Sequence, residues 1–444
     1  MIKLVLLLLG SDTIRGRWSV VAACGGAAMF LAATILADAA DGVVAVTTET
    51  FGYILVFDGA AGLALVLGPR TASNRLHLLR SLGLLVLGLL IIDMPWRNDI
   101  ANSLLFGLAF LADGITRIAS AAVVRFRRWR WVMAGGIAEL GLAALALASW
   151  PVSYQKTVPF CIGVFLLLSG TAAMRISLML RRIPSGASVL ALPAFAARGW
   201  YAAVPDRPSS AGAPDGESKL ILHVWTPTGS IAAAQRRPVL DRYIAAVDRE
   251  GRISTGHAAL EMPPSLYISH YPRTEIDRNA ADFARQLRAT AENDVPGRFL
   301  TSYAEEAGGW TEADAHVVFH RFDGVRLRTF WEAYRQDDTY NLTNRNCSVT
   351  VAVALDVALE GSAGNVLTPW RMLRLMANPD LWIAAHLRHR AEAMTWTPGL
   401  VLDYARAMRR VVEPPPGPWL GRVRDALRRL QRRPVPIESG ATPA

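Results

Sequence analysis

The sequence predicts a multi-domain protein: an all-α bundle of six transmembrane helices, followed by an α+β domain. Two observations predict this fold class. Six long apolar runs are confined to the first 182 of the 444 residues, and strand-like alternation mixed with helical periodicity begins only after residue 217. Each run is near the length that a helix needs to cross about 30 Å of hydrocarbon. The runs begin at Trp18, Phe51, Leu78, Asn102, Trp131 and Thr157.

Changes of pattern divide the chain into four parts. We expect a membrane domain at residues 1–182, a linker rich in Pro, Gly, Ser and Ala at 183–217, an α+β domain at 218–361, and a helical extension at 362–444. The segment from Met1 to Gly10 is apolar but too short to span a bilayer. We expect this segment to be an interfacial lead-in.

Basic residues predict the orientation of the bundle, because Lys and Arg close to helix ends remain in the cytoplasm. One side of the six predicted spans collects them, whereas the other side has only Arg97 and Lys156. We therefore expect a multi-pass protein of the bacterial inner membrane, with its N- and C-termini in the cytoplasm. The basic side consists of Lys3, Arg15, Arg17, Arg70, Arg75, Arg80, Arg125, Arg127, Arg128, Arg130, Arg175, Arg181 and Arg182.

The net charge of +10 has the same explanation. Much of the excess lies in these loops and in the C-terminal tail, where anionic lipid accounts for it. We expect membrane lipid as a partner and no nucleic acid. The three cysteines predict no disulfide framework, since Cys24 and Cys161 fall inside predicted spans and Cys347 stands alone in the soluble part.

An internal repeat runs through the even-numbered spans. The pattern is Gly, then Asp or Ser six residues later, then Gly, and it recurs every 55 to 56 residues, which indicates three copies of a helix pair. Small residues at such positions let helix backbones approach closely. The acidic members predict either a hydrogen bond across the bundle or a polar pathway. The three copies are Gly52, Asp58 and Gly59; Gly107, Asp113 and Gly114; and Gly163, Ser169 and Gly170.

The membrane part resembles the HdeD-type acid-resistance membrane proteins, which are built from repeated helix pairs. The resemblance covers about residues 15–182 and rests on the glycines of the even spans and on Met94-Pro95-Trp96 and Trp150-Pro151 after the odd spans. It implies a six-helix fold. It carries over no defined chemistry.

Strands and helices alternate in the soluble part. Leu220 to Trp225, Arg252 to Glu261 and Leu266 to His270 read as strands, and 238–249 reads as a helix. After Pro414 a basic amphipathic helix is predicted from Trp419 to Arg433. This helix suits either a membrane surface or packing on its own domain.

Cys347 is the candidate nucleophile. It follows a polar run and opens an apolar stretch that ends before Gly361. Alternating valines in this stretch also fit a strand, but its length and its Ala, Leu and Asp content favour a buried helix. At the start of such a helix the dipole and the free amides stabilise a thiolate. The alternative is a small core residue, which is the commoner role of a lone intracellular cysteine.

His257 is the candidate base that takes the thiol proton, and a third polar group would hold its ring. His270, on the next strand, is our first choice for this group. Glu261, on the same strand face as His257, is the alternative. His386 and His389 lie one helical turn apart without a nearby Cys or carboxylate pair, so we expect no metal site, and no cofactor is expected.

These motifs resemble the circularly permuted papain-like hydrolases, which include the lecithin:retinol acyltransferase family and NlpC-like relatives. The resemblance covers about residues 218–361, with Gly256-His257-Ala258, then His270, then Asn346-Cys347. It implies Cys347 as nucleophile, His257 as base, His270 as the orienting residue and Asn346 as support. Ser348-Val349 departs from the Glu-His that usually follows in the acyltransferases.

Together these features predict a membrane-anchored cysteine hydrolase or acyltransferase that acts on an ester or amide through a Cys thioester. The substrate is expected to be an acyl-lipid or a peptide. One alternative is a cysteine peptidase with the same site. Another is a non-enzymatic membrane sensor or scaffold.

Overall fold

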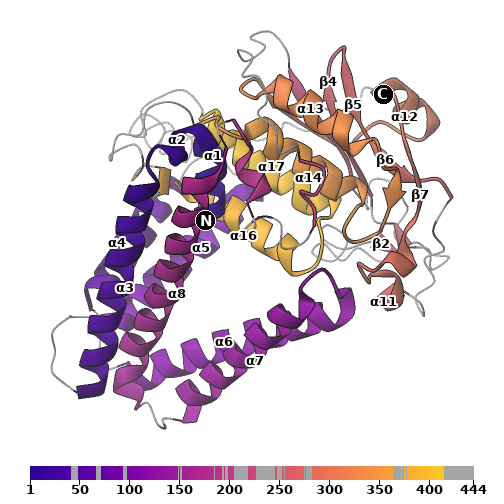
Figure 1. Ribbon diagram of the computed structural model, residues 1–444. Coiled ribbons are helices and arrows are strands. Elements are labelled where there is room, and N and C mark those ends of the chain that lie inside the picture. Colours follow the sequence, from indigo (N-terminus) through magenta and orange to yellow (C-terminus); the bar gives the residue numbers. More distant parts are fainter. Residues whose placement is uncertain are drawn as a thin grey trace, which may run out of the picture.

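The computed structural model of the chain (Figure 1) describes most of the sequence, and every structural statement below concerns the described residues. These are residues 1–41, 49–66, 72–93, 98–148, 150, 153–184, 186–192, 195, 199–204, 219–226, 246–247, 253–254, 256–274, 276, 283–363, 372, 375–376 and 378–414.

The six predicted spans are helices that pack in three antiparallel pairs (Figure 1). Four of them, α3, α6, α7 and α8, are long and apolar enough to cross a membrane. The chain is therefore a membrane protein, while the crossing by α4 and α5 stays a prediction. The pairs are α3 (Trp18–Asp41) with α8 (Tyr154–Arg182), α4 (Glu49–Val66) with α5 (Ala72–Ile91), and α6 (Asp99–Val124) with α7 (Trp129–Ala148).

The repeated glycines lie where the paired helices touch. A Cβ atom on Gly59 would come within 2.8 Å of the backbone oxygen of Ser81 on α5. On Gly114 it would come within 2.9 Å of Gly136 O on α7, and on Gly170 within 2.8 Å of Gly25 O on α3. Backbones that close leave no room for a side chain, so the expected role of the small residues in helix packing is confirmed.

The two acidic residues of the repeat are ion-paired. Asp58 Oδ2 lies 2.5 Å from Arg80 Nη2 on the neighbouring α5. Asp113 Oδ2 lies 2.9 Å from Arg117 Nε one turn along α6, and the same nitrogen lies 3.0 Å from Glu139 Oε2 on α7. Both acids therefore hold an arginine within or across a helix pair.

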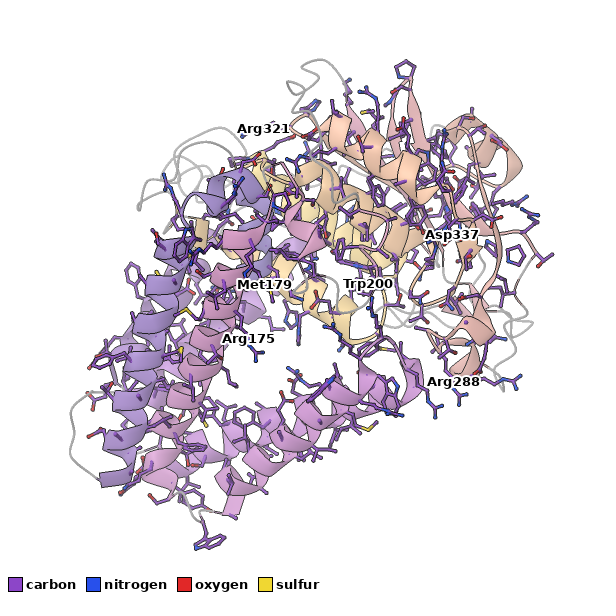
Figure 2. The ribbon with its side chains drawn as sticks, in the orientation of Figure 1. Arg175, Met179, Trp200, Arg288, Arg321 and Asp337 are labelled. Carbon is purple, nitrogen blue, oxygen red and sulfur yellow. The ribbon has the colours of Figure 1, made fainter. Side chains whose placement is uncertain are left out.

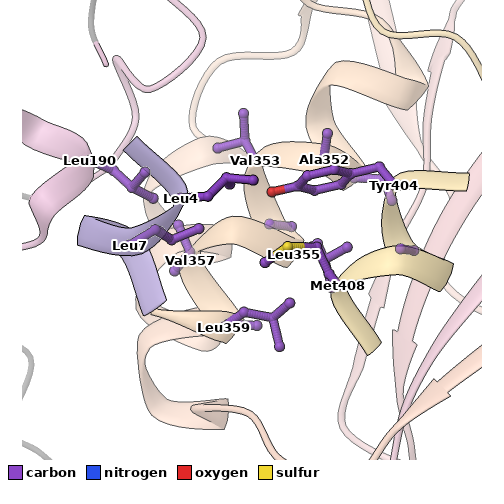
Figure 3. Packing of buried hydrophobic residues seen from close by; sticks show 14 of the residues in the cluster. Leu4, Leu7, Leu190, Ala352, Val353, Leu355, Val357, Leu359, Tyr404 and Met408 are labelled. Atoms are coloured by element: carbon purple, nitrogen blue, oxygen red, sulfur yellow. The ribbon is translucent and has the colours of Figure 1, made fainter. Parts of the chain in front are cut away.

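The N-terminal helix α1 (Ile2–Leu9) belongs to the core of the soluble part, and our expectation of an interfacial lead-in is wrong. Leu4 to Leu9 are all buried, and the backbone N–H of Gly361 donates to Leu7 O at 2.9 Å. Figure 3 shows Leu4 and Leu7 against Leu190 and Val357. The run is too short to span, and an apolar helix that is buried on most sides gains more from a protein core than from an interface. A short helix α2 (Ser11–Arg15) connects α1 to the bundle.

Two small antiparallel sheets build the strand part. The first has the order β5-β4-β1-β8 and the second β6-β7-β9, with an isolated pair β2-β3. The first sheet places Leu222, Val224 and Leu260 on the main core, and Trp225 and Ala259 on the opposite face, as strand alternation requires. The strands are β1 (Leu220–Trp225), β2 (Ala246–Val247), β3 (Ile253–Ser254), β4 (His257–Met262), β5 (Leu266–Ile268), β6 (His270–Pro272), β7 (Val295–Phe299), β8 (Ala315–Phe319) and β9 (Thr339–Tyr340).

Helix α14 (Cys347–Leu359) runs through the centre of the core, and all of its residues are buried. This confirms the helix over the strand alternative. Around it lie α1, the sheet and the helices of the C-terminal part (Figures 1 and 3). The remaining helices are η1 (Val189–Ala191), α11 (Phe283–Gln286), η3 (Ala291–Asn293), α12 (Tyr303–Gly309), α13 (Gly324–Tyr334), α16 (Pro379–Ala393) and α17 (Pro398–Val412).

The described residues of the predicted linker pack into this core instead of running free. Val189 and Leu190 are fully buried, and Tyr201 donates through its hydroxyl to Asp356 Oδ2 at 2.6 Å. The same carboxylate accepts from Tyr404 at 2.5 Å and pairs with Arg388 Nη1 at 2.8 Å. One buried acid on α14 thus ties together the linker, α16 and α17.

Two predicted helices remain partly or wholly outside this picture. Ala246 and Val247, inside the predicted helix 238–249, form strand β2, so that prediction is wrong at these residues. The other residues of that segment and the basic helix from Trp419 to Arg433 lie outside the described residues.

Candidate active site

Cys347 is the first residue of α14, and Asn346 fixes it there. Asn346 Oδ1 accepts the backbone N–H of Val349 at 2.8 Å, which caps the helix. Its Nδ2 donates to Leu342 O at 2.8 Å and to Trp396 O at 3.3 Å. The expected support by Asn346 is therefore a helix cap that also ties the start of α14 to two loops.

His257 opens β4 and meets the thiol of Cys347. Gly256 before it has φ 69°, a left-handed conformation that suits glycine and turns the chain into the strand. Burial by itself lowers the pKa of His257, but the negative charge of Cys347 and a hydrogen bond to it outweigh burial and raise that pKa. The structure thus brings together the two residues that the sequence paired as nucleophile and base.

The same contact changes the pKa of Cys347 in the opposite direction. Burial raises the pKa of the thiol, yet the charge of His257 and hydrogen bonds from His257, Ser348 and the Ala258 backbone lower it overall. The side chain is buried, with 7% of its surface exposed. Cys347 and His257 thus shift each other's pKa in the direction of a thiolate–imidazolium pair.

The Nε2 nitrogen of His257 is held by two polar groups. It lies 3.0 Å from Ser269 Oγ and 3.1 Å from Glu306 Oε1. A proton on Nε2 shared with this carboxylate leaves Nδ1 free to accept a proton. This is the tautomer that a general base needs.

Glu306 is the functional residue that sequence reasoning missed. It lies on α12, is 3% exposed, and accepts the hydroxyls of Tyr267 and Tyr271, each at 2.6 Å. Burial and then the charge of Glu306 raise the pKa of both tyrosines far above their usual range, so both remain donors. The ring of Tyr271 also stacks on His257, with centroids 4.0 Å apart.

His270 does not hold the ring of His257 in the structure. Its Nε2 hydrogen-bonds to Asp338 O at 3.2 Å, and its Nδ1 lies 3.3 Å from the hydroxyl of Tyr334. Burial lowers its pKa to about 4, so it is neutral near pH 7. The placement expected of His270 is wrong because β6 belongs to the second sheet and turns this side chain to the loop before α14.

The alternative third residue, Glu261, is engaged elsewhere on the strand face that it shares with His257. Its Oε2 lies 2.8 Å from His223 Nε2, and His223 Nδ1 lies 3.0 Å from His316 Nδ1. Among the described residues, no group of three or more His, Cys, Asp or Glu side chains has a metal-binding arrangement.

A cavity of about 700 Å³ opens beside Cys347. Cys347, Ser348 and Trp396 line it, and the Trp396 ring packs on Trp200, with centroids 6.3 Å apart. Trp200 is labelled in Figure 2. The site thus combines a thiol with a lowered pKa, an imidazole whose Nε2 is held by two polar groups, and an adjoining cavity, an arrangement that could support nucleophilic catalysis.

Comparison of the chain with protein-family models, curated proteins and solved structures gave no match.

Proposed function

We propose that the protein is a membrane-anchored cysteine hydrolase or acyltransferase in which Cys347 attacks an ester or amide carbonyl. The observation that carries the proposal is the buried contact of Cys347, at the start of α14, with His257, whose Nε2 lies 3.1 Å from Glu306 Oε1. A sensor or scaffold has no need of such a pair. The resemblance to permuted papain-like hydrolases points to the same chemistry.

The proposed reaction has two halves. The thiolate of Cys347 forms a C–S bond to the carbonyl carbon, and the imidazolium of His257 gives its proton to the leaving oxygen or nitrogen as that bond breaks. Water or another acceptor then loses a proton to His257 and attacks the thioester, and the C–S bond breaks to restore the thiolate. Glu306 keeps the ring oriented and stabilises its positive charge throughout.

The start of α14 supplies the groups that stabilise the oxyanion. Asn346 accepts the N–H of Val349 with its side-chain Oδ1 at 2.8 Å and the N–H of Thr350 with its backbone oxygen at 3.0 Å. The backbone N–H groups of Cys347 and Ser348 come before these donors and have no acceptor within the helix. Donors at this end of the dipole suit the negative oxygen of a tetrahedral intermediate.

We propose the bacterial inner membrane as the location, with both termini in the cytoplasm. The distribution of Arg and Lys supports this, because the basic turn between α6 and α7 lies next to the soluble part. The N–H of Ala289 donates to Val124 O at the end of α6, at 2.6 Å. Basic residues at this end of a span favour the cytoplasmic side.

The test uses the full-length protein in lipid nanodiscs, with Cys24 and Cys161 changed to Ala so that Cys347 is the one remaining thiol. We expect a thiol-directed probe to label Cys347 at neutral pH, and mass spectrometry to detect an acyl adduct on it after addition of ester substrates. Cys347→Ala should abolish turnover of a panel of esters, amides and peptides.

Full turnover of that panel by Cys347→Ala, or an unreactive Cys347 at neutral pH, would overturn the proposal. Cleavage of peptides without cleavage of esters would instead assign the site to a peptidase. The parent protein with all three cysteines is the control for the two background substitutions.

A further inference from the structure

The cavity beside Cys347 is lined in part by helices outside the region that resembles the permuted papain-like hydrolases. These are α5 of the membrane domain and α16 of the C-terminal part, which pack against each other (Figure 1). Trp382, His386 and Arg390 of α16 line the cavity at intervals of four residues, so they form one face of that helix. The ligand chemistry of this face is therefore not implied by the resemblance.

The charged side chains on the cavity wall are basic. Arg80 of α5 and Arg390 of α16 line it together with His386, and none of the described lining residues is Asp or Glu. Arg80 pairs with Asp58 on α4 at 2.5 Å, and its guanidinium lies 5.1 Å from the Trp382 ring. The charge of Arg80 is thus already balanced, and Arg390 supplies the excess positive charge.

Arg390 is left without a counter-ion, although α16 carries two acidic residues. Asp380 pairs with Arg410 of α17 at 2.6 Å, and Glu392 pairs with Lys3 of α1 at 2.9 Å. Among the residues that the structure describes, no carboxylate pairs with Arg390. Its place in the last turn of α16 suits a positive charge, because the dipole is negative there. The guanidinium remains open to an anion from outside the chain.

The end of α16 lies close to the candidate nucleophile. Arg390 belongs to the last turn of this helix, and Thr395 and Trp396, just after it, also line the cavity. Asn346, the residue before Cys347, donates through Nδ2 to Thr395 Oγ1 and to Trp396 O, each at 3.3 Å. These hydrogen bonds tie the end of α16 to the start of α14, so Arg390 and Cys347 open onto the same cavity.

His386, one turn before Arg390, lies in a positive potential. Burial lowers the pKa of His386, and the charges of His389 and Arg390 lower it further. The neutral ring can still donate a hydrogen bond to an anion. The α16 face thus combines an unpaired guanidinium with a second donor.

On the basis of the proposed function, we infer that the substrate of Cys347 carries a carboxylate or phosphate group, which binds to Arg390 and accepts a further hydrogen bond from His386. A guanidinium binds either group through two parallel N–H···O bonds. The remaining wall is mostly apolar, so this attraction is screened less than at an open surface. Arg390 thereby selects anionic esters or amides over neutral ones and holds them beside Cys347.

Two alkylating reagents of similar size test the anion site. Iodoacetate carries a carboxylate, iodoacetamide is uncharged, and both alkylate a thiolate. The protein is the full-length chain with Cys24→Ala and Cys161→Ala, in zwitterionic nanodiscs. Arg390→Gln should lower the ratio of the iodoacetate rate to the iodoacetamide rate at Cys347 by roughly threefold to tenfold. Arg390→Lys keeps the charge and should retain most of the ratio.

Arg409→Gln is the matched control. Arg409 is also an exposed arginine in the last turn of a helix, α17, and it is absent from the cavity lining. This variant loses the same charge and should keep the ratio of the parent. An unchanged ratio in Arg390→Gln, or an equal fall in both variants, would overturn the inference.

Protection by added anions measures binding directly. Inorganic phosphate or glutarate should slow the reaction of Cys347 with iodoacetamide in a saturable way, and Arg390→Gln should weaken this protection roughly tenfold. Protection by phosphate alone assigns a phosphate group to the substrate, and protection by glutarate alone assigns a carboxylate. Protection by neither anion overturns the site.

Turnover tests the link to the substrate. Arg390→Gln should lower the ratio of kcat/KM for mono-p-nitrophenyl azelate, which ends in a carboxylate, to that for its uncharged methyl ester by roughly tenfold. An equal kcat/KM for the two esters in the parent contradicts selection by charge. If the alkylation ratio depends on Arg390 in zwitterionic nanodiscs but not in phosphatidylglycerol nanodiscs, a lipid headgroup occupies the arginine, and the assignment to the substrate is wrong.

The two proposals fail in different ways. A Cys347 that reacts with neither reagent at neutral pH removes the thiol mechanism itself. A Cys347 that reacts with both, at a ratio that Arg390→Gln leaves unchanged, removes only the anion site.

Discussion

The Oε1 oxygen of Glu306 lies 3.1 Å from Nε2 of His257. The carboxylate is fixed by two tyrosine hydroxyls and the ring by stacking on Tyr271, so neither partner can turn without breaking several contacts. A buried carboxylate in this place selects the tautomer and stabilises the imidazolium once it has formed. Glu306 therefore completes the arrangement that Cys347 and His257 begin.

Glu306→Gln tests this role. The amide keeps the size of the side chain but loses the negative charge, so we expect kcat/KM for an ester substrate to fall by roughly 10- to 100-fold. The measurement is turnover of p-nitrophenyl acetate by the full-length protein in nanodiscs.

His270→Gln is the matched control, because the described hydrogen bonds of the His270 ring go to Asp338 O, Tyr334 and Thr350. Its kcat/KM should stay within about threefold of the parent. An equal loss in both variants would contradict the assignment of Glu306 as the positioning residue.

The pH dependence of Cys347 alkylation follows from its lowered pKa. The thiolate is the reactive form, so in the Cys24→Ala/Cys161→Ala background the rate with iodoacetamide should reach half its maximum at a lower pH than for an ordinary thiol. Alkylation rates between pH 4 and 10, read by mass spectrometry, provide the measurement. A midpoint at or above the value for free cysteine would contradict the ion pair.

His257→Ala should move this midpoint upward. Removal of the imidazolium leaves burial as the main influence, and burial raises the pKa of Cys347. Turnover by the parent should rise with pH as the pair forms and fall when His257 loses its proton, above the ordinary pH range for histidine because its pKa is raised. Both limbs of that profile describe the coupled pair.

Local signals in the sequence predicted part of the site. The polar run before Cys347 and the apolar stretch after it predicted the helix α14, and the glycine before His257 marked the start of a strand. These features depend on neighbouring residues. To predict the contact of Cys347 with His257, the resemblance to the permuted papain-like hydrolases was needed in addition.

Glu306 could not be predicted in this way. It lies in a helix of only 7 residues, and nothing near it in the chain indicates that the fold turns it towards His257. Its burial depends on Tyr267 and Tyr271, which lie on strands β5 and β6. The wrong prediction for Met1 to Gly10 has a similar cause. An apolar helix too short to span a membrane has the same sequence pattern at a membrane interface and in a protein core.

Asn346→Ala should weaken both the fold and the site. The substitution removes the cap of α14 and the amide bonds to Leu342 and Trp396, so we expect a loss of about 1–2 kcal/mol in the free energy of unfolding and slower alkylation of Cys347 at neutral pH. Asn346→Asp keeps the capping oxygen and should restore part of the stability but not the amide bonds. Identical behaviour of the two variants would contradict a separate role for the cap.

We expect the largest loss in the free energy of unfolding from a substitution at Asp356. Its carboxylate is fully buried, with 0% of the residue exposed, and it satisfies Arg388, Tyr201 and Tyr404 at once. Asp356→Asn removes the nearer of two carboxylates that pair with the buried guanidinium, the other being Glu392 at 3.4 Å, and we expect about 3–5 kcal/mol of destabilisation, seen as a lower thermal midpoint of the purified protein. Asp338→Asn, in the exposed pair with Arg273, is the matched control and should cost less than about 1 kcal/mol. Because Asp356 joins α14 to the linker, α16 and α17, Asp356→Asn should also slow the alkylation of Cys347 at the other end of the same helix. Equal thermal midpoints for Asp356→Asn and Asp338→Asn would show that the network does not stabilise the core.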